Sequence, residues 1–399
     1  MGKKKFKKKP GATLDDRRKV LREARRELAK EATGKKTTPK YTVDQLLDKV
    51  EEYTDRFEYE LAQKFCQRAL EVEPDNLRVL ETTGTLLLEL GNTEGAKQCF
   101  GRAVEVCPES GHSKYMYLGQ LFEGSQAVDC FQKGIELMMK EKVAQQAKEV
   151  AAASGGKDES TVTDREISSA HCSIAELYMT DCCFDEEAEA KCKGHVEKAI
   201  AIDTQNPEAY QLMASFLLTK EDKEGAREMI DKSVSLWLPK AKELDGNRDQ
   251  NRDEDQDPNK GEDEDFDPVE TIPLDYDTRL TTAKLLIEVE NYETCVDILE
   301  GLLDENDEDP QVYYLMGWSN FLQGQGFQGN ARFYLKKAQK IYTKVKYEDP
   351  DLLKHVEQLL LELGTDDENV EDDEDEEEEE CEQAELEIES DSDSDDMQQ

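Results

Sequence analysis

Three glycines in the C-terminal third of the chain have the spacing of a dinucleotide-binding loop. They are Gly324, Gly326 and Gly329, in the order Gly-x-Gly-x-x-Gly. Such a loop binds a pyrophosphate only where it follows a β-strand and opens a helix, because the N-terminus of that helix then receives the negative charge. Here the glycines lie between two helices of an expected repeat, where they make a turn. The pattern therefore predicts no nucleotide site.

A second group of residues carries side chains that bind zinc. A zinc site needs ligands that converge tetrahedrally, and they usually come in pairs at short spacing. Cys172 and Cys192 fall instead at small or apolar positions of predicted helices, where a buried cysteine packs as a small hydrophobe. We expect core packing, with no metal ion and no other cofactor, for His171, Cys172, Cys182, Cys183, Cys192 and His195.

The abundant carboxylates do not have the pattern of a catalytic pair. The chain has 94 Asp and Glu against 51 Lys and Arg, for a formal net charge of −43. They come in exposed runs, whereas a catalytic pair needs two different and partly desolvated environments. No phosphate loop, nucleophile elbow or zinc-protease helix is present either. We expect a protein that is not an enzyme, that repels nucleic acid and anionic lipid, and that attracts basic partners.

Cysteine usage and hydropathy bear on the compartment. Ten cysteines in 399 residues, two of them adjacent, do not form the dense framework of a secreted disulfide protein. No apolar stretch is long enough for a membrane span, so we expect no membrane association. A reducing compartment is the interpretation, and we expect nucleus and cytoplasm.

The elements that position these side chains follow from a repeat. Pro74 and Pro108 lie 34 residues apart, and aligning on them brings small residues together. Alanines 62 and 96 then share the twentieth position, and alanines 69 and 103 the twenty-seventh. Small residues at such positions let two antiparallel helices approach closely, and proline ends the second helix. This spacing is that of the tetratricopeptide repeat (TPR).

The pattern returns along the chain and predicts about seven units. Units built around Ala214 and Ala283 keep the register, and one around Gly317 keeps it up to about two inserted residues. A third unit around Gly119 and a fourth around Ala175 are degenerate. The amphipathic stretch Asp349–Leu363 reads as a terminal capping helix, which covers the last apolar face of an array. The predicted fold is all-α, a TPR superhelical solenoid with a disordered basic N-terminus and a disordered acidic C-terminal tail.

The predicted organisation alternates repeats with charged segments. It comprises a basic head at 1–40, repeats one to three at 41–139, an insertion at 140–166, repeats four and five at 167–240, an acidic disordered loop at 241–271, repeats six and seven at 272–345, a capping helix at 346–364 and an acidic disordered tail at 365–399.

The two ends of the chain carry opposite charge. The head begins with a lysine run at 3–9, interrupted only by Phe6, which suits an import receptor. RNA binding is a weaker interpretation, since no aromatic platform accompanies the lysines. The tail has no Lys or Arg between Asp366 and Asp396. We expect it to shield a basic client, and its Ser-Asp end suits an acid-directed kinase.

The candidate site is the inner groove of the array. In such repeats the first helix lines the groove, and its positions 2, 5, 9, 12 and 13 point into it. These positions carry carboxylates at several levels and aromatic residues in the last unit. We expect a Lys/Arg-rich segment of a client protein to bind there through ion pairs and cation–π contacts. The predicted groove residues are Asp44, Glu51, Asp55, Glu81, Glu89, Asp277, Glu288, Tyr314, Trp318 and Phe321.

The order of these features resembles one family, the eukaryotic chaperones dedicated to ribosomal large-subunit protein four (L4). The repeats with Ala62, Ala69 and Pro74, the acidic run Glu371–Glu380 and the segment Tyr313–Trp318 carry the resemblance. It implies a non-catalytic chaperone that holds a basic loop of L4 in its concave groove during ribosome biogenesis.

Two other binding functions compete with this one. An adaptor for the acidic C-termini of heat-shock chaperones needs Lys and Asn at inner positions 5 and 9 of the opening repeat, where this chain has Leu47 and Glu51. An acidic peptide would be repelled there. A scaffold subunit of a larger nuclear complex stays open as the alternative.

Overall fold

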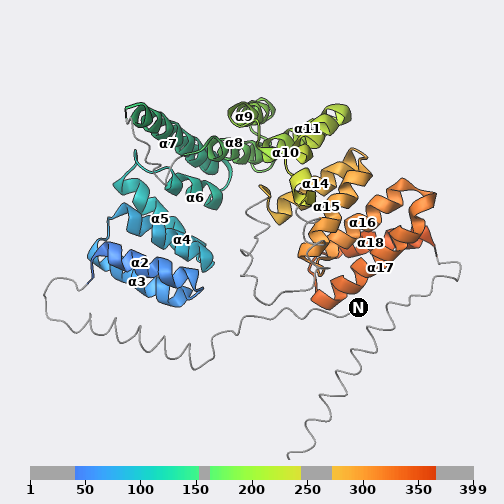
Figure 1. Ribbon diagram of the computed structural model, residues 1–399, viewed down its shortest axis with the longest axis horizontal. Helices are drawn as coiled ribbons and strands as arrows, with labels where there is room; N and C mark the ends of the chain where they lie inside the picture. The colour runs from blue at the N-terminus through green and yellow to red at the C-terminus, as the bar shows by residue number, and fades with distance from the viewer. Residues whose placement is uncertain (1–40, 152–161, 244–271, 365–399) are drawn as a thin grey trace, which may run out of the picture. The chain divides into compact units, whose positions relative to one another are not determined.

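The computed structural model describes residues 41–151, 162–243 and 272–364, and every regular element in these ranges is a helix (Figure 1). The chain forms two compact units that divide after Val289. The basic head, the acidic tail and nearly all of the acidic loop predicted from the sequence lie outside the described residues.

The first unit is a row of helices in which each packs against the next in the chain. Its elements are α2 (Val43–Asp55), α3 (Tyr59–Val72), α4 (Leu77–Glu89), α5 (Thr93–Val106), α6 (Ser113–Leu121), α7 (Gly124–Ala151), α8 (Asp164–Met179), α9 (Ala188–Ile202), α10 (Pro207–Leu218), α11 (Lys223–Ser235) and α14 (Tyr276–Glu288). α3 and α5 each end two residues before Pro74 and Pro108, as the repeat predicts.

The second unit contains the end of the array. Its elements are α15 (Tyr292–Glu305), α16 (Pro310–Gln323), a 3-10 turn η1 (Gln325–Phe327), α17 (Gln328–Val345) and α18 (Pro350–Leu363). α18 packs on both α16 and α17, and its apolar face is buried with theirs. It therefore has the position expected of the capping helix. The Gly-x-Gly-x-x-Gly stretch forms the connection from α16 to α17, with no strand before it.

Helix starts are fixed by local hydrogen bonds. Thr42 accepts a hydrogen bond from the Gln45 amide while the Gln45 side chain accepts one from the Thr42 amide, which is a complete capping box at α2. Thr163 and Glu166 make the same box at α8. These pairings satisfy amides that the first helical turn leaves unbonded.

The small residues of the repeat are close-packing positions. Ala62, Ala69, Ala96 and Ala103 are fully buried. At Gly84 an added Cβ would lie 2.6 Å from the ring of Phe100, which is also fully buried. In this repeat α4 and α5 therefore approach more closely than a side chain at position 84 would allow.

The turn between the two helices of a repeat has a left-handed residue. Gly91 has a φ of 70°, and its equivalents Phe57, Glu221 and Glu290 have φ values of 58–60°. Left-handed backbone favours glycine, because a Cβ crowds the neighbouring carbonyl there. Three of these turns consequently hold a residue in a conformation that glycine would adopt with less strain.

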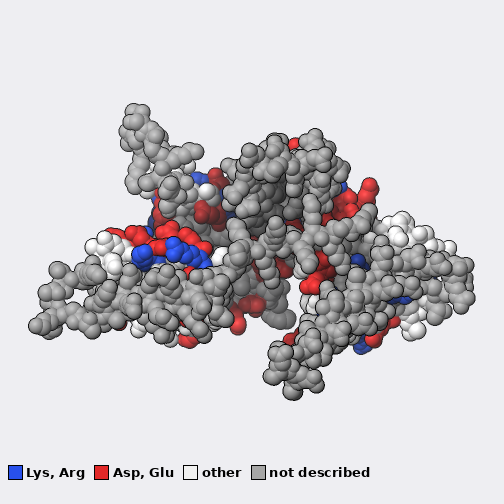
Figure 2. Space-filling view, turned by 60° about the horizontal axis from the view of Figure 1, so that its bottom comes forward, with Lys and Arg blue, Asp and Glu red and all other residues white. Residues whose placement is uncertain are grey.

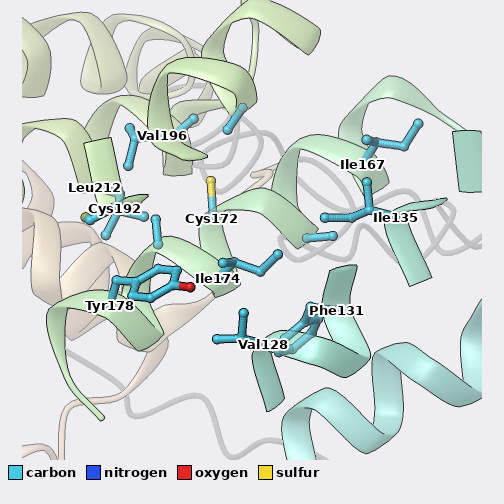
Figure 3. Packing of buried hydrophobic residues seen from close by; sticks show 14 of the residues in the cluster. Val128, Phe131, Ile135, Ile167, Cys172, Ile174, Tyr178, Cys192, Val196 and Leu212 are labelled. Atoms are coloured by element: carbon cyan, nitrogen blue, oxygen red, sulfur yellow. The ribbon is translucent and has the colours of Figure 1, made fainter. Parts of the chain in front are cut away.

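The degenerate units differ from a regular repeat in their connections. α6 is short, and α7 follows it after two residues, which explains why Ala127 and Phe131 arrive early in the sequence. α7 continues to Ala151 and enters the segment predicted as an insertion. The fourth unit has the long turn predicted around Cys182–Glu187, and its side chains pack with those of α7 and α10 in one core (Figure 3).

Candidate functional site

A cleft of about 710 Å³ opens on the first compact unit, which ends at Val289, between the first helices of four successive repeats. The face shown in Figure 2 exposes many Asp and Glu side chains among the described residues. The residues that line the cleft come from α6, α8, α10 and α14 and from the turns that follow α6 and α8, apart from Phe131 of α7. We call this site the cleft; its lining comprises Gly119, Gln120, Phe122, Phe131, Ser173, Glu176, Leu177, Met179, Thr180, Asp181, Glu208, Gln211, Leu212, Ser215, Asp277, Thr278, Thr281 and Leu285.

The repeat register explains why these side chains face the cleft. Ala175 and Ala214 are the small residues at the eighth position of their units. Counting from them puts Glu176, on α8, at position 9 of the fourth repeat, and Glu208, on α10, at position 2 of the fifth. Asp277 is position 2 of α14. These are positions that point to the inner face of a repeat array, so four helices contribute to one surface.

Two carboxylates in the cleft are held in an unfavourable environment. The helices around Glu176 remove much of the water near its carboxylate, although the residue itself is exposed. This desolvation, and then the charge of Glu208, raise the pKa of Glu176 to about 7. Burial also raises the pKa of Glu208, against the hydrogen bond that Ser169 Oγ donates to its Oε2 at 2.7 Å. A positive charge in the cleft would relieve both.

Apart from Asp181 and Asp277, the remaining lining is apolar or neutral. Phe122, Leu177 and Met179 are half-buried on the cleft wall, and Leu212 and Leu285 are buried beneath it. None of the lining residues is Lys, Arg or His. The arrangement therefore suits a ligand that presents positive charge and apolar surface together.

A buried hydrogen-bond network holds α10 and α14 together beside the cleft. Gln211 donates to the Thr278 carbonyl at 3.2 Å, and Thr282 Oγ1 donates to Gln211 Oε1 at 2.9 Å. Thr282 is fully buried. Because a buried amide left without partners is costly, this network fixes the two helices in one register and keeps the cleft walls in place.

Only one of the predicted groove residues, Asp277, lines the cleft. The other predicted carboxylates of the first compact unit lie on the helices α2, α4 and α14. Five of them are exposed, namely Asp44, Glu51, Asp55, Glu89 and Glu288. Asp44 makes a 3.4 Å ion pair with Arg78. Their role in client binding stays a prediction.

Glu81 has a different environment from the other predicted carboxylates. One of its oxygens is buried without a hydrogen-bond partner, and burial raises its pKa. Nearby, the buried Lys114 ammonium donates to the carbonyls of Ser110 and Gly111, and burial lowers its pKa. Glu81 therefore belongs in part to a polar cluster between repeats two and three.

The predicted aromatic residues form a cluster of their own in the second compact unit, which begins at Glu290. Tyr314 and Trp318 stack at 5.9 Å between ring centroids, and both rings meet His355 of α18 edge-on. Tyr314 Oη lies 2.7 Å from His355 Nδ1, and burial raises the pKa of Tyr314 to about 12. With Phe321, these half-buried rings pack against the core beneath the capping helix.

Glu176 and Glu208 were missed by the sequence analysis, although the register could have found them. The rule that selected Asp277 also selects Glu208 once it is applied to the fifth unit. Glu176 lies in the fourth unit, whose long turn obscured the pattern. Both units had already been recognised by their small residues Ala175 and Ala214.

Most of the cysteine and histidine group lies in the core of the fourth repeat, but Cys183 is exposed in the turn after α8, so the expectation of core packing is wrong for that residue. Cys172, Cys182 and Cys192 are buried in it (Figure 3 shows the first and the last). His171 and His195 lie 2.9 Å apart between Nδ1 atoms, and burial lowers the pKa of each to about 4. In the described part of the chain, no three His, Cys, Asp or Glu residues converge as metal ligands would.

None of the described helices is long and apolar enough to cross a membrane.

Comparison with known proteins gives three further findings. A tetratricopeptide-repeat profile matches residues 78–110. A probable assembly chaperone of rpl4 from Schizosaccharomyces pombe is 28% identical over 302 residues, which cover 71% of this chain and 79% of that protein. Its counterpart from Emericella nidulans is 27% identical over 355 residues, covering 78% and 80%.

A solved structure of residues 1–338 of an assembly chaperone of RpL4 has the same fold. Its TM-score is 0.60 at 24% identity, and the match covers 71% of this chain and 97% of that one. The fold and the resemblance predicted from the sequence are thereby confirmed: the chain is a tetratricopeptide-repeat protein related to the fungal proteins named as probable assembly chaperones of rpl4.

Proposed function

We propose that this chain is a non-catalytic assembly chaperone that holds a basic segment of ribosomal protein L4 against the acidic inner face of its repeats. The observation that carries the proposal is the cleft, where Glu176, Glu208 and Asp277 come from three successive first helices and no Lys, Arg or His is among the lining residues. The names of the two fungal relatives supply the identity of the client. Their chaperone names and the repeat fold are those of binding proteins.

The physical role of the groove is to neutralise and cover a cationic segment. Newly made basic proteins aggregate with polyanions, and an acidic surface competes with those polyanions for the same charges. Each exposed ion pair contributes only about 0.2–1 kcal/mol, so several carboxylates must act together. Their joint field also speeds encounter with a basic partner.

The test is binding of purified ribosomal protein L4 to the full chain. We expect one L4 per chain on size exclusion, and a dissociation constant that rises with salt. Replacing the three cleft carboxylates (Glu176→Gln, Glu208→Gln and Asp277→Asn) should weaken binding about 3- to 100-fold, from three pairs of the strength given above.

A matched variant controls for net charge. It removes three exposed carboxylates that lie on second helices of the first compact unit and do not line the cleft: Glu94→Gln, Glu224→Gln and Glu228→Gln. This variant should bind L4 as the unchanged chain does. Equal weakening by both triple variants would show that only net charge matters and would refute the groove.

The cellular context is part of the proposal. We place the protein in nucleus and cytoplasm, with the lysine run of the head as the contact for an import receptor. Affinity capture of the tagged chain separates the chaperone from the alternative. A single free ribosomal protein supports the chaperone, whereas a stable set of many subunits supports a scaffold of a larger nuclear complex.

A further inference from the structure

We propose that the cleft is the anchoring subsite of the groove, and that it binds one Lys or Arg side chain together with a large apolar side chain next to it in the client. This inference rests on the proposed function and specifies the segment that is held. It predicts that lysines and arginines alone do not suffice for tight binding.

The acidic side of the cleft accounts for the basic half of this preference. The charge of Glu208 disfavours ionisation of Glu176, and Asp181 and Asp277 add carboxylates to the lining. Arg165 favours the charged form of Glu208 from outside the lining, but its guanidinium is bound to Asp203 at 2.5 Å and to the Gln205 carbonyl at 2.6 Å. A client ammonium or guanidinium would supply the missing counter-charge.

The apolar part of the lining accounts for the apolar half of this preference. Phe122, Leu177 and Met179 each keep part of their surface accessible on the cleft wall. Met and aromatic side chains adapt to differently shaped apolar groups. Apolar contact is insensitive to salt, whereas exposed ion pairs weaken as salt rises. A segment with both groups would therefore stay bound where a purely cationic one is released.

Two synthetic peptides of equal length and charge test the preference. Both are Lys/Arg-rich; one carries a single Leu beside an Arg, and the other has Gly in place of that Leu. At raised salt we expect the Leu peptide to bind the full chain about tenfold more tightly, which corresponds to partial burial of one Leu side chain. Equal affinities at all salt concentrations would overturn the inference.

Filling the cleft tests the location. Thr281 is exposed on the α14 wall, so Thr281→Tyr adds bulk there with little demand on the core. Thr343→Tyr on α17 is the matched control, since both hydroxyls donate to the carbonyl four residues earlier at 3.0 Å. We expect the first variant to lose most of the tenfold preference and the second to keep it.

A second filling variant and the natural client complete the design. Ser215→Phe enters the cleft from α10 and should act like Thr281→Tyr, with circular dichroism verifying that each variant is folded. If L4 binds the unchanged chain and both filled variants equally, the subsite is wrong while the proposed function stands. If the peptides discriminate but L4 does not bind, the subsite stands and the proposed client is wrong.

Discussion

Replacing Gly84 by alanine tests whether close packing at the eighth position holds the repeat together. The new Cβ would lie 2.6, 2.7 and 2.9 Å from three atoms of the Phe100 ring, where ordinary contacts begin at 3.4 Å. The ring is fully buried and is stacked on Tyr117 at 4.8 Å between centroids, so it has little room to move. Overpacking of this kind costs about 1–3 kcal/mol.

The matched control is Gly101→Ala, in the helix that carries Phe100. An added Cβ there meets nothing within 4 Å. Alanine is favoured over glycine inside a helix by about 1 kcal/mol at both sites. We therefore expect Gly101→Ala to raise the free energy of unfolding by about 0.5–1 kcal/mol, and Gly84→Ala to lower it by about 1 kcal/mol.

The assay is urea unfolding of the full chain followed by far-UV circular dichroism, with the slope of the transition compared among the three proteins. The difference in the free energy of unfolding between the two variants measures the steric clash, because both variants gain the same helix propensity. If Gly84→Ala is as stable as Gly101→Ala, then the small residues of the repeat do not act by close approach, and the packing argument fails.

Three further predictions use the pKa shifts and one hydrogen bond. Glu176→Gln should stabilise the chain by on the order of 1 kcal/mol at pH 8 and hardly at pH 5, as thermal unfolding at both pH values would measure. The reason is that the raised pKa of Glu176 favours folding below about pH 4.5, and this benefit is lost as pH rises through about 7. The pKa values of His171 and His195 are depressed from 6.5 to about 4, so stability should fall as pH drops through that window, and His195→Gln should flatten the fall in urea unfolding measured from pH 7 to pH 4. Tyr314→Phe removes the contact to His355 and should cost about 0.5–1.5 kcal/mol of stability; L4 affinity should change little, because the ring that the groove prediction uses for stacking remains.

The sequence was sufficient to predict the fold because the repeat places the same demand at the same position in every unit. Ala62 and Ala96 are fully buried because a larger residue at the twentieth position would force the two helices apart. The capping helix was predictable for a related reason, since an exposed apolar face at the end of an array must be covered. What the periodicity does not carry is the connection between units, as the direct passage from α6 into α7 shows.

The site was predicted only in outline, because register tells which helix face a residue lies on but not what the neighbouring repeat brings to it. Glu81 has an inner position, yet Lys114 of the next unit contributes a buried charge beside it. Tyr314 and Trp318 also have inner positions, and the capping helix brings His355 against them. In both cases the contact comes from the next repeat or from the capping helix, and the number of residues between the two contacting positions varies along the chain.

Glu176 indicates how such a groove is prepared for its client. A carboxylate with a pKa near 7 is only partly charged in the empty protein, because the surrounding helices and Glu208 oppose its ionisation. A bound cation removes that opposition, so the proton leaves when the client arrives and binding should tighten between pH 6 and pH 8. A surface carboxylate without packed helices and a second carboxylate beside it is already charged at pH 6 and shows no such dependence. The pH profile of client affinity, compared between the unchanged chain and Glu176→Gln, therefore distinguishes binding in the cleft from binding to the acidic surface at large: a profile that is the same in both proteins would place the client outside it.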